Sequence, residues 1–126
     1  MRVARPSVEF LQWFGLLAAP IAWTGQLIVG FGATIAKCAA GGSRWGIPIV
    51  TWQIAITAAA ATVVVLGQAA AITAWRETRA AEHDGPPPEG RVHFFAVAAA
   101  LGNVLFLGIV LLSGIGTATL APCHQA

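Results

Sequence analysis

The sequence predicts an all-α integral membrane protein with three transmembrane helices, its N-terminus in the cytoplasm and its C-terminus outside. Hydrophobic residues make up 57% of the 126 residues, and charged residues make up only 10%. A soluble domain carries about 25% charged residues, because its surface must stay solvated. The mean hydropathy is +0.75, and the charges leave long uncharged runs. A net charge of +2 is too small for a surface that binds nucleic-acid phosphates.

Uncharged runs predict the helices, within a single membrane domain that covers 1–126. The runs are 10–36, 45–75 and 92 to the C-terminus. About 20 apolar residues are enough to cross a hydrocarbon core of about 30 Å. Because lipid offers no hydrogen bonds to the backbone, each run should be helical. We expect helices at about 10–36, 47–76 and 92–120, with a cytoplasmic loop at 77–91.

The first helix follows Arg2 and Arg5, as the apolar part of a signal peptide would. Its apolar run is far longer than the ~7–15 residues of that part, and no clean small-x-small cleavage site precedes Lys37. We therefore expect this helix to be retained. The second helix should begin near Pro48, which suits a first helical turn. The prolines at 86–88 should separate the second helix from the third.

The basic residues predict the orientation. Two crossings separate the N-terminal tail from the 77–91 loop, so both should lie on the same side. That side carries most of the basic residues, namely Arg2, Arg5, Arg76, Arg79 and Arg91, whereas the other carries only Lys37 and Arg44. The positive-inside rule places the first set in the cytoplasm. We expect a multi-pass protein of the bacterial inner membrane.

Two cysteines should meet on the external side. Cys38 follows the first helix and Cys123 follows the third, and both helices run outward. External thiols are in an oxidising compartment, so we predict a Cys38–Cys123 disulfide. The alternative is a copper or zinc site that Cys38, Cys123 and His124 would form together.

The predicted membrane interior contains neutral polar residues but no charged residue or histidine in mid-helix. Transporters and proton pumps usually keep ionisable residues there. No nucleophile–base pair or metal cluster is visible, so we predict no enzymatic activity, no cofactor and no resident metal. The amides of Gln26, Gln53, Gln68 and Asn103 should face other helices, and we take Gln26, Gln68 and Asn103 as the main packing residues. We expect Asn103 to bond Gln26 or Gln68.

Small residues four positions apart mark places where helices can approach closely. Two such pairs are Gly67 with Ala71 and Ala98 with Gly102. Three helices cannot bury all faces of this kind among themselves. Some of this surface is therefore expected to contact another membrane protein.

Several motifs carry a resemblance to a known family. They are the FGLLAAPIAWTGQL stretch at 14–27, Ala74-Trp75-Arg76, the RVHFF stretch at 91–95, and the terminal Pro122-Cys123. Together with a cysteine after the first helix, this plan resembles small bacterial three-helix membrane proteins often encoded beside haem–copper cytochrome oxidases. The resemblance implies a respiratory context and no catalytic residues.

The sequence therefore favours a non-catalytic accessory subunit of a larger membrane complex, and the resemblance implies a respiratory one. Its partners would be other integral membrane subunits and lipid, not nucleic acid. The alternative is an assembly or metallochaperone-like factor that acts through Cys38, Cys123 and His124. A small transporter or channel formed by oligomerisation is the third possibility, which an interior without ionisable residues disfavours.

Overall fold

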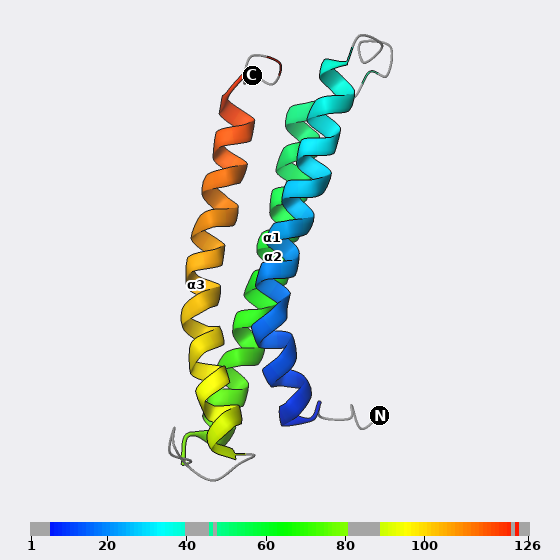
Figure 1. The fold of residues 1–126 in the computed structure, drawn as a ribbon. Coiled ribbons are helices and arrows are strands. Elements are labelled where there is room, and N and C mark those ends of the chain that lie inside the picture. The colour runs from blue at the N-terminus through cyan, green and yellow to red at the C-terminus, as the bar shows by residue number, and fades with distance from the viewer. Residues whose placement is uncertain (1–5, 40–45, 47, 81–88, 122, 124–126) are drawn as a thin grey trace, which may run out of the picture.

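The computed structural model describes residues 6–39, 46, 48–80, 89–121 and 123. Three helices occupy most of these residues: α1 (Val8–Cys38), α2 (Ile49–Thr78) and α3 (Glu89–Thr119). Figure 1 shows α1 and α3 running in the same direction and α2 running in the opposite one. Each helix is long and apolar enough to cross a membrane. The predicted all-helical fold, with three helices long and apolar enough to cross a membrane, is confirmed.

The helix ends differ from the prediction by a few residues. α1 begins at Val8, and Ser7 caps it by accepting a hydrogen bond from the Phe10 backbone N–H at 3.2 Å. α2 begins at Ile49, directly after Pro48. α3 begins at Glu89, so the expected loop at 77–91 is shorter than predicted. The physical reason is that the helices continue past the uncharged runs: Arg76, Glu77 and Arg91 are helical and exposed, so their charges can stay solvated.

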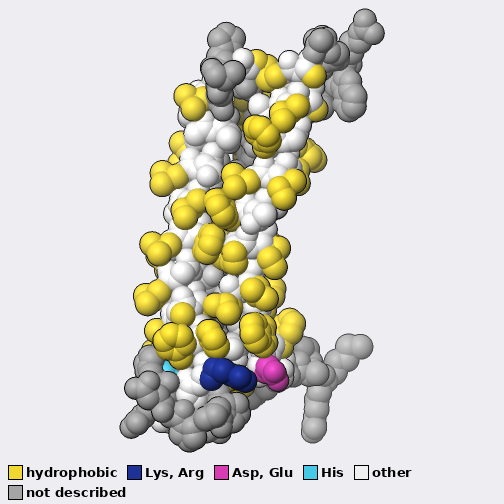
Figure 2. Space-filling model, viewed as in Figure 1, with side chains coloured by type: hydrophobic (Ala, Val, Ile, Leu, Met, Phe, Trp, Pro, Cys, Tyr) yellow, Lys and Arg dark blue, Asp and Glu magenta, His cyan; other side chains and the backbone are white. Residues whose placement is uncertain are grey.

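Small residues form most of the interior of the described bundle. Among the described larger side chains, only Val64 and Val110 are completely enclosed. The other buried hydrophobic residues are Ala18, Ala19, Ile49, Ala60, Ala70, Ala71, Ala74, Ala96 and Ala99. Large apolar side chains point outward instead: Leu105 is 70% exposed and Ile28 is 68% exposed. Figure 2 shows hydrophobic side chains, in yellow, along the length of the helices on the face drawn. That distribution suits a bundle surrounded by lipid, in which helices pack through small residues.

Charged side chains gather at one end of the bundle. This end, where α2 ends and α3 begins, is called the loop end, and the opposite end, which contains Cys38 and Cys123, is called the disulfide end. Of the charged side chains that the structure describes, only Lys37 belongs to the disulfide end; the others are Glu9, Arg76, Glu77, Arg79 and Arg91. Figure 2 shows basic and acidic side chains at the loop end of the face drawn.

Glycines allow α1 and α2 to approach closely. A Cβ added to Gly15 would lie 3.0 Å from the backbone nitrogen of Ala71, and one added to Gly67 would lie 3.1 Å from the Ala18 Cβ. The Gly67–Ala71 pair therefore packs within the bundle, as its spacing allows. The second predicted pair does not. Ala98 is exposed, and a Cβ on Gly102 would meet nothing within 4 Å.

Candidate functional site

A disulfide joins the ends of α1 and α3. The Cys38 and Cys123 Cα atoms are 5.5 Å apart, within the usual range for a disulfide. The predicted pairing is confirmed. His124, the third member of the alternative metal site, lies outside the described residues. In this oxidised form the two sulfurs are bonded to each other, so a metal site would first require their reduction.

Two buried amides, at different levels below the disulfide, tie α1 to α3. Nearer the loop end, Asn103 Nδ2 of α3 donates to the Gly15 carbonyl oxygen of α1 at 3.0 Å. Nearer the disulfide end, Gln26 Nε2 of α1 donates to Thr57 Oγ1 of α2 at 3.1 Å and to the Val110 carbonyl oxygen of α3 at 3.2 Å. Each amide is thus used to hold helices against one another.

The predicted partner of Asn103 is wrong. We expected Gln26 or Gln68, but Asn103 bonds a backbone oxygen. Gln26 is eleven residues beyond Gly15 on α1, which is about 16 Å along the helix axis. Gly15 has no side chain to shield its own carbonyl, so a short asparagine on the facing helix reaches it. Gln68 is half-buried, and its Oε1 is enclosed without a hydrogen bond.

Gln53 faces another helix, as expected of its amide, although it was not among the main packing residues predicted. It is 4% exposed, and its Nε2 donates to the Gly30 carbonyl oxygen at 3.0 Å and to Thr34 Oγ1 at 3.1 Å. Both acceptors belong to α1, so Gln53 joins α2 to α1. A polar amide in the second uncharged run was a visible signal, but nothing in the sequence distinguishes Gln53 from Gln68.

Replacing Asn103 by leucine tests the lower tie. The hydrogen bond to Gly15 would be lost, and such bonds in membrane proteins are worth about 0.6 kcal/mol on average and up to about 1.7. We expect Asn103→Leu to lower the free energy of unfolding in detergent by about that amount. Gln68→Leu is the matched control, because it removes an amide whose oxygen has no hydrogen bond. An equal loss in both variants would contradict the assigned role of Asn103.

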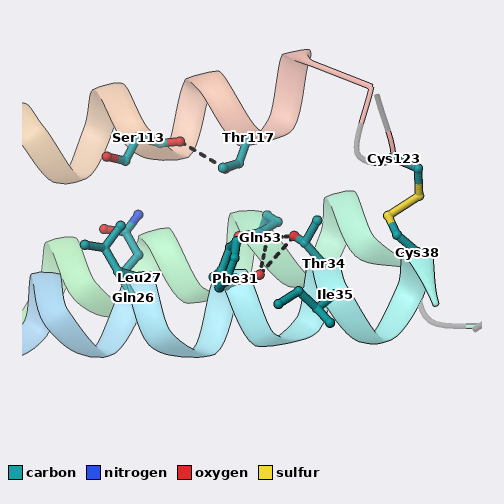
Figure 3. A pocket seen from close by; sticks show the side chains of 11 residues that line it. Gln26, Leu27, Phe31, Thr34, Ile35, Cys38, Gln53, Ser113, Thr117 and Cys123 are labelled. Atoms are coloured by element: carbon teal, nitrogen blue, oxygen red, sulfur yellow. Dashed lines mark hydrogen bonds between the residues drawn. A yellow bond between two sulfur atoms is a disulfide. The ribbon is translucent and has the colours of Figure 1, made fainter. Parts of the chain in front are cut away.

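Between the Gln26 tie and the disulfide, α1 and α3 enclose a cleft. We call it the disulfide-end cleft, and its volume is about 500 Å³. Its polar walls are formed by Gln26 and Thr34 of α1, Gln53 of α2, and Ser113 and Thr117 of α3. Figure 3 shows these side chains between the two helices, with the disulfide across one end. The apolar lining comes from α1, through Leu27, Phe31 and Ile35.

At the loop end, His93 is more buried than expected of a residue at a membrane interface. It is 5% exposed, and its Nδ1 lies 3.2 Å from Thr78 Oγ1. This contact joins the start of α3 to the end of α2. Among the residues that the structure describes, no three His, Cys, Asp or Glu side chains are grouped as they would be around a metal ion.

No protein-family model, curated protein or solved structure matches this chain.

Proposed function

We propose that this chain is a non-catalytic accessory subunit of a larger integral membrane complex, and that the complex is respiratory. The observation that carries the proposal is the use made of buried polar groups. The amides of Gln26, Gln53 and Asn103 all donate to a neighbouring helix. They therefore serve the packing of the bundle, which is the chemistry of a structural subunit. The family resemblance supports the respiratory context and a bacterial inner membrane.

A surface for partner helices also supports the proposal. Ala98 and Gly102 have the small-residue spacing typical of close helix contacts, yet the bundle does not use them for packing. Gly25 and Gly32 of α1 are similar, since a Cβ on either would meet nothing within 4 Å. Neighbouring subunits would pack against such positions.

Co-purification tests the proposal. A tagged chain extracted in mild detergent should bring down other integral membrane proteins at a fixed stoichiometry, measured by mass spectrometry. Ala98→Leu should reduce this recovery, because a bulky side chain would separate the partner helix. Ala59→Leu is a matched control at an exposed alanine of α2. Recovery of the chain only as a homo-oligomer would contradict the proposal and favour the channel.

The Cys38→Ser variant distinguishes the accessory-subunit function from a metallochaperone function. For a subunit, the variant should be retained less well in the complex, while turnover per assembled complex stays unchanged. For a metallochaperone, the partner should assemble but lack metal. Metal content and subunit stoichiometry should therefore be measured together. A fully assembled, metal-depleted partner would overturn the structural role.

The proposed orientation places the loop end in the cytoplasm. The charge distribution supports it, because basic residues are more frequent on the side that contains the loop. A cysteine introduced by Asp84→Cys should react with a membrane-impermeant maleimide only from the cytoplasmic side. The native cysteines should not react, since they are joined to each other. Labelling of this cysteine from outside intact cells would show that the loop end faces outward, contrary to the proposed orientation.

A further inference from the structure

The disulfide-end cleft has the size of a ligand site and a defined depth. Its volume of about 500 Å³ falls within the ~300–1,000 Å³ range of small-molecule pockets. It extends from Gln26 to Cys38 along α1, which is about 18 Å of helix. That length is slightly more than half of a hydrocarbon core of about 30 Å. The cleft is therefore about as deep as one leaflet.

The amide and threonine donors in its walls are already used. Gln26 donates to Thr57 and Val110, and Gln53 donates to Gly30 and Thr34. Thr34 Oγ1 donates to the Gly30 carbonyl oxygen at 3.0 Å.

On the α3 side, Thr117 Oγ1 donates to the carbonyl oxygens of Ser113 and Gly114, at 3.0 and 3.1 Å. These amides and threonines can therefore offer a ligand only acceptor lone pairs. Of these side chains, only the Ser113 hydroxyl can both donate a hydrogen bond to a ligand and accept one from it.

An unsatisfied acceptor lies at the inner end of the cleft. Gln26 lines the cleft and is 7% exposed, and its Oε1 is enclosed without a hydrogen bond. A buried acceptor without a donor costs about 1–3 kcal/mol. Both hydrogens of the same amide are held by Thr57 and Val110, so turning the amide would break those bonds. Because this oxygen is enclosed by protein atoms, a ligand in the cleft does not reach it, and the acceptors left for a ligand are the side-chain oxygens of Thr34, Gln53 and Thr117.

The shape and charge of the cleft restrict its occupant further. None of its lining residues is charged, so an ionised head group would be buried without a partner, which is unfavourable. The disulfide crosses the end of the cleft, so a partner helix of full length could not continue past it. The occupant must instead be short, apolar along most of its length, and neutral at its polar end.

We propose that the disulfide-end cleft binds one membrane lipid whose polar end is neutral and donates hydrogen bonds through hydroxyl groups. Each of its hydroxyls would donate to one of the side-chain oxygens of Thr34, Gln53 and Thr117, and its chain would lie against Leu27 and Phe31. Monoacylglycerols and long-chain alcohols both have this chemistry. The site does not depend on the accessory-subunit role, since it is formed by this chain alone.

Photolabelling in native membranes tests the site. The probe is a monoacylglycerol with a diazirine near its head group, and its partner probe has both hydroxyls methylated. We expect cross-links to α1 and α3 residues that line the cleft. Each lost donated hydrogen bond should raise the concentration needed for half-maximal labelling about fivefold, so the methylated probe, which loses two, should need about 25 times more. A long-chain alcohol bearing the same diazirine shows which of the two head groups binds better.

Paired variants locate the lipid. Leu27→Trp should fill the cleft and abolish labelling, whereas Ile28→Trp places the same bulk outside it. Thr117→Val should reduce the preference for the hydroxylated probe. Thr119→Val is its control, because Thr119 makes the same kind of backbone bonds one face away from the cleft.

Three results would overturn the inference. One is equal labelling by the hydroxylated and methylated probes, which would remove the donor requirement. Another is labelling that survives Leu27→Trp. The third is cross-linking from the cleft only to another protein, which would identify the occupant as a partner subunit and leave the accessory role intact.

Discussion

Replacing Cys38 and Cys123 together by serine is expected to lower the free energy of unfolding by several kcal/mol. The disulfide joins positions 85 residues apart, and a cross-link of that span restricts the unfolded chain by about 4–5 kcal/mol in the loop-entropy treatment. Helices that stay inserted restrict the unfolded chain already, so this figure is an upper bound. We expect about 2–4 kcal/mol, the usual range for a disulfide.

Unfolding in mixed micelles by increasing SDS, followed by tryptophan fluorescence, measures the effect of removing the disulfide. A reductant should bring the wild-type chain to the level of the double serine variant and leave that variant unchanged. If the oxidised wild type and the variant unfold at the same SDS fraction, the disulfide does not stabilise the bundle. The disulfide-end cleft should also widen in the variant, because the remaining α1–α3 amide ties lie below it.

Gly15→Ala is expected to cause the second large loss, by forcing α1 and α2 apart. The new Cβ would lie 3.0 Å from the Ala71 nitrogen and 3.1 Å from both its Cα and Cβ. Backbone atoms cannot rotate away as a side chain does. Overpacking of this kind costs about 1–3 kcal/mol. The same SDS titration measures it.

Gly25→Ala is the matched control on the same helix, because its Cβ would meet nothing within 4 Å. We expect no loss there. Gly15 also accepts the hydrogen bond of Asn103, so the effects of Gly15→Ala and Asn103→Leu should not add. A Gly15→Ala variant as stable as the wild type would show that α1 and α2 can separate at this point without loss.

The sequence alone determined the three helices and the pairing of the cysteines. Long uncharged runs must be helical in lipid, because the backbone there can bond only to itself. Cys38 and Cys123 follow helices that run in the same direction, so counting crossings was enough to bring them to one end. Both conclusions depend on local composition and on the number of crossings. Neither requires knowing how one helix is rotated about its axis relative to another.

The tertiary structure alone decided which polar groups meet and where the cleft lies. Most of the surface of these helices is apolar, and the few amides indicate an inward direction without fixing which groups meet. Contacts of small residues set that rotation, as Gly15 does with Ala71 and Gly67 with Ala18. This rotation directs Asn103 to a backbone carbonyl and leaves Gln68 Oε1 without a bond. In the part of the chain that the structure describes, the disulfide joins α1 and α3 above the cleft and hydrogen bonds join them below it. The separation of the helices between these links is a property of the packed bundle that sequence spacing does not encode.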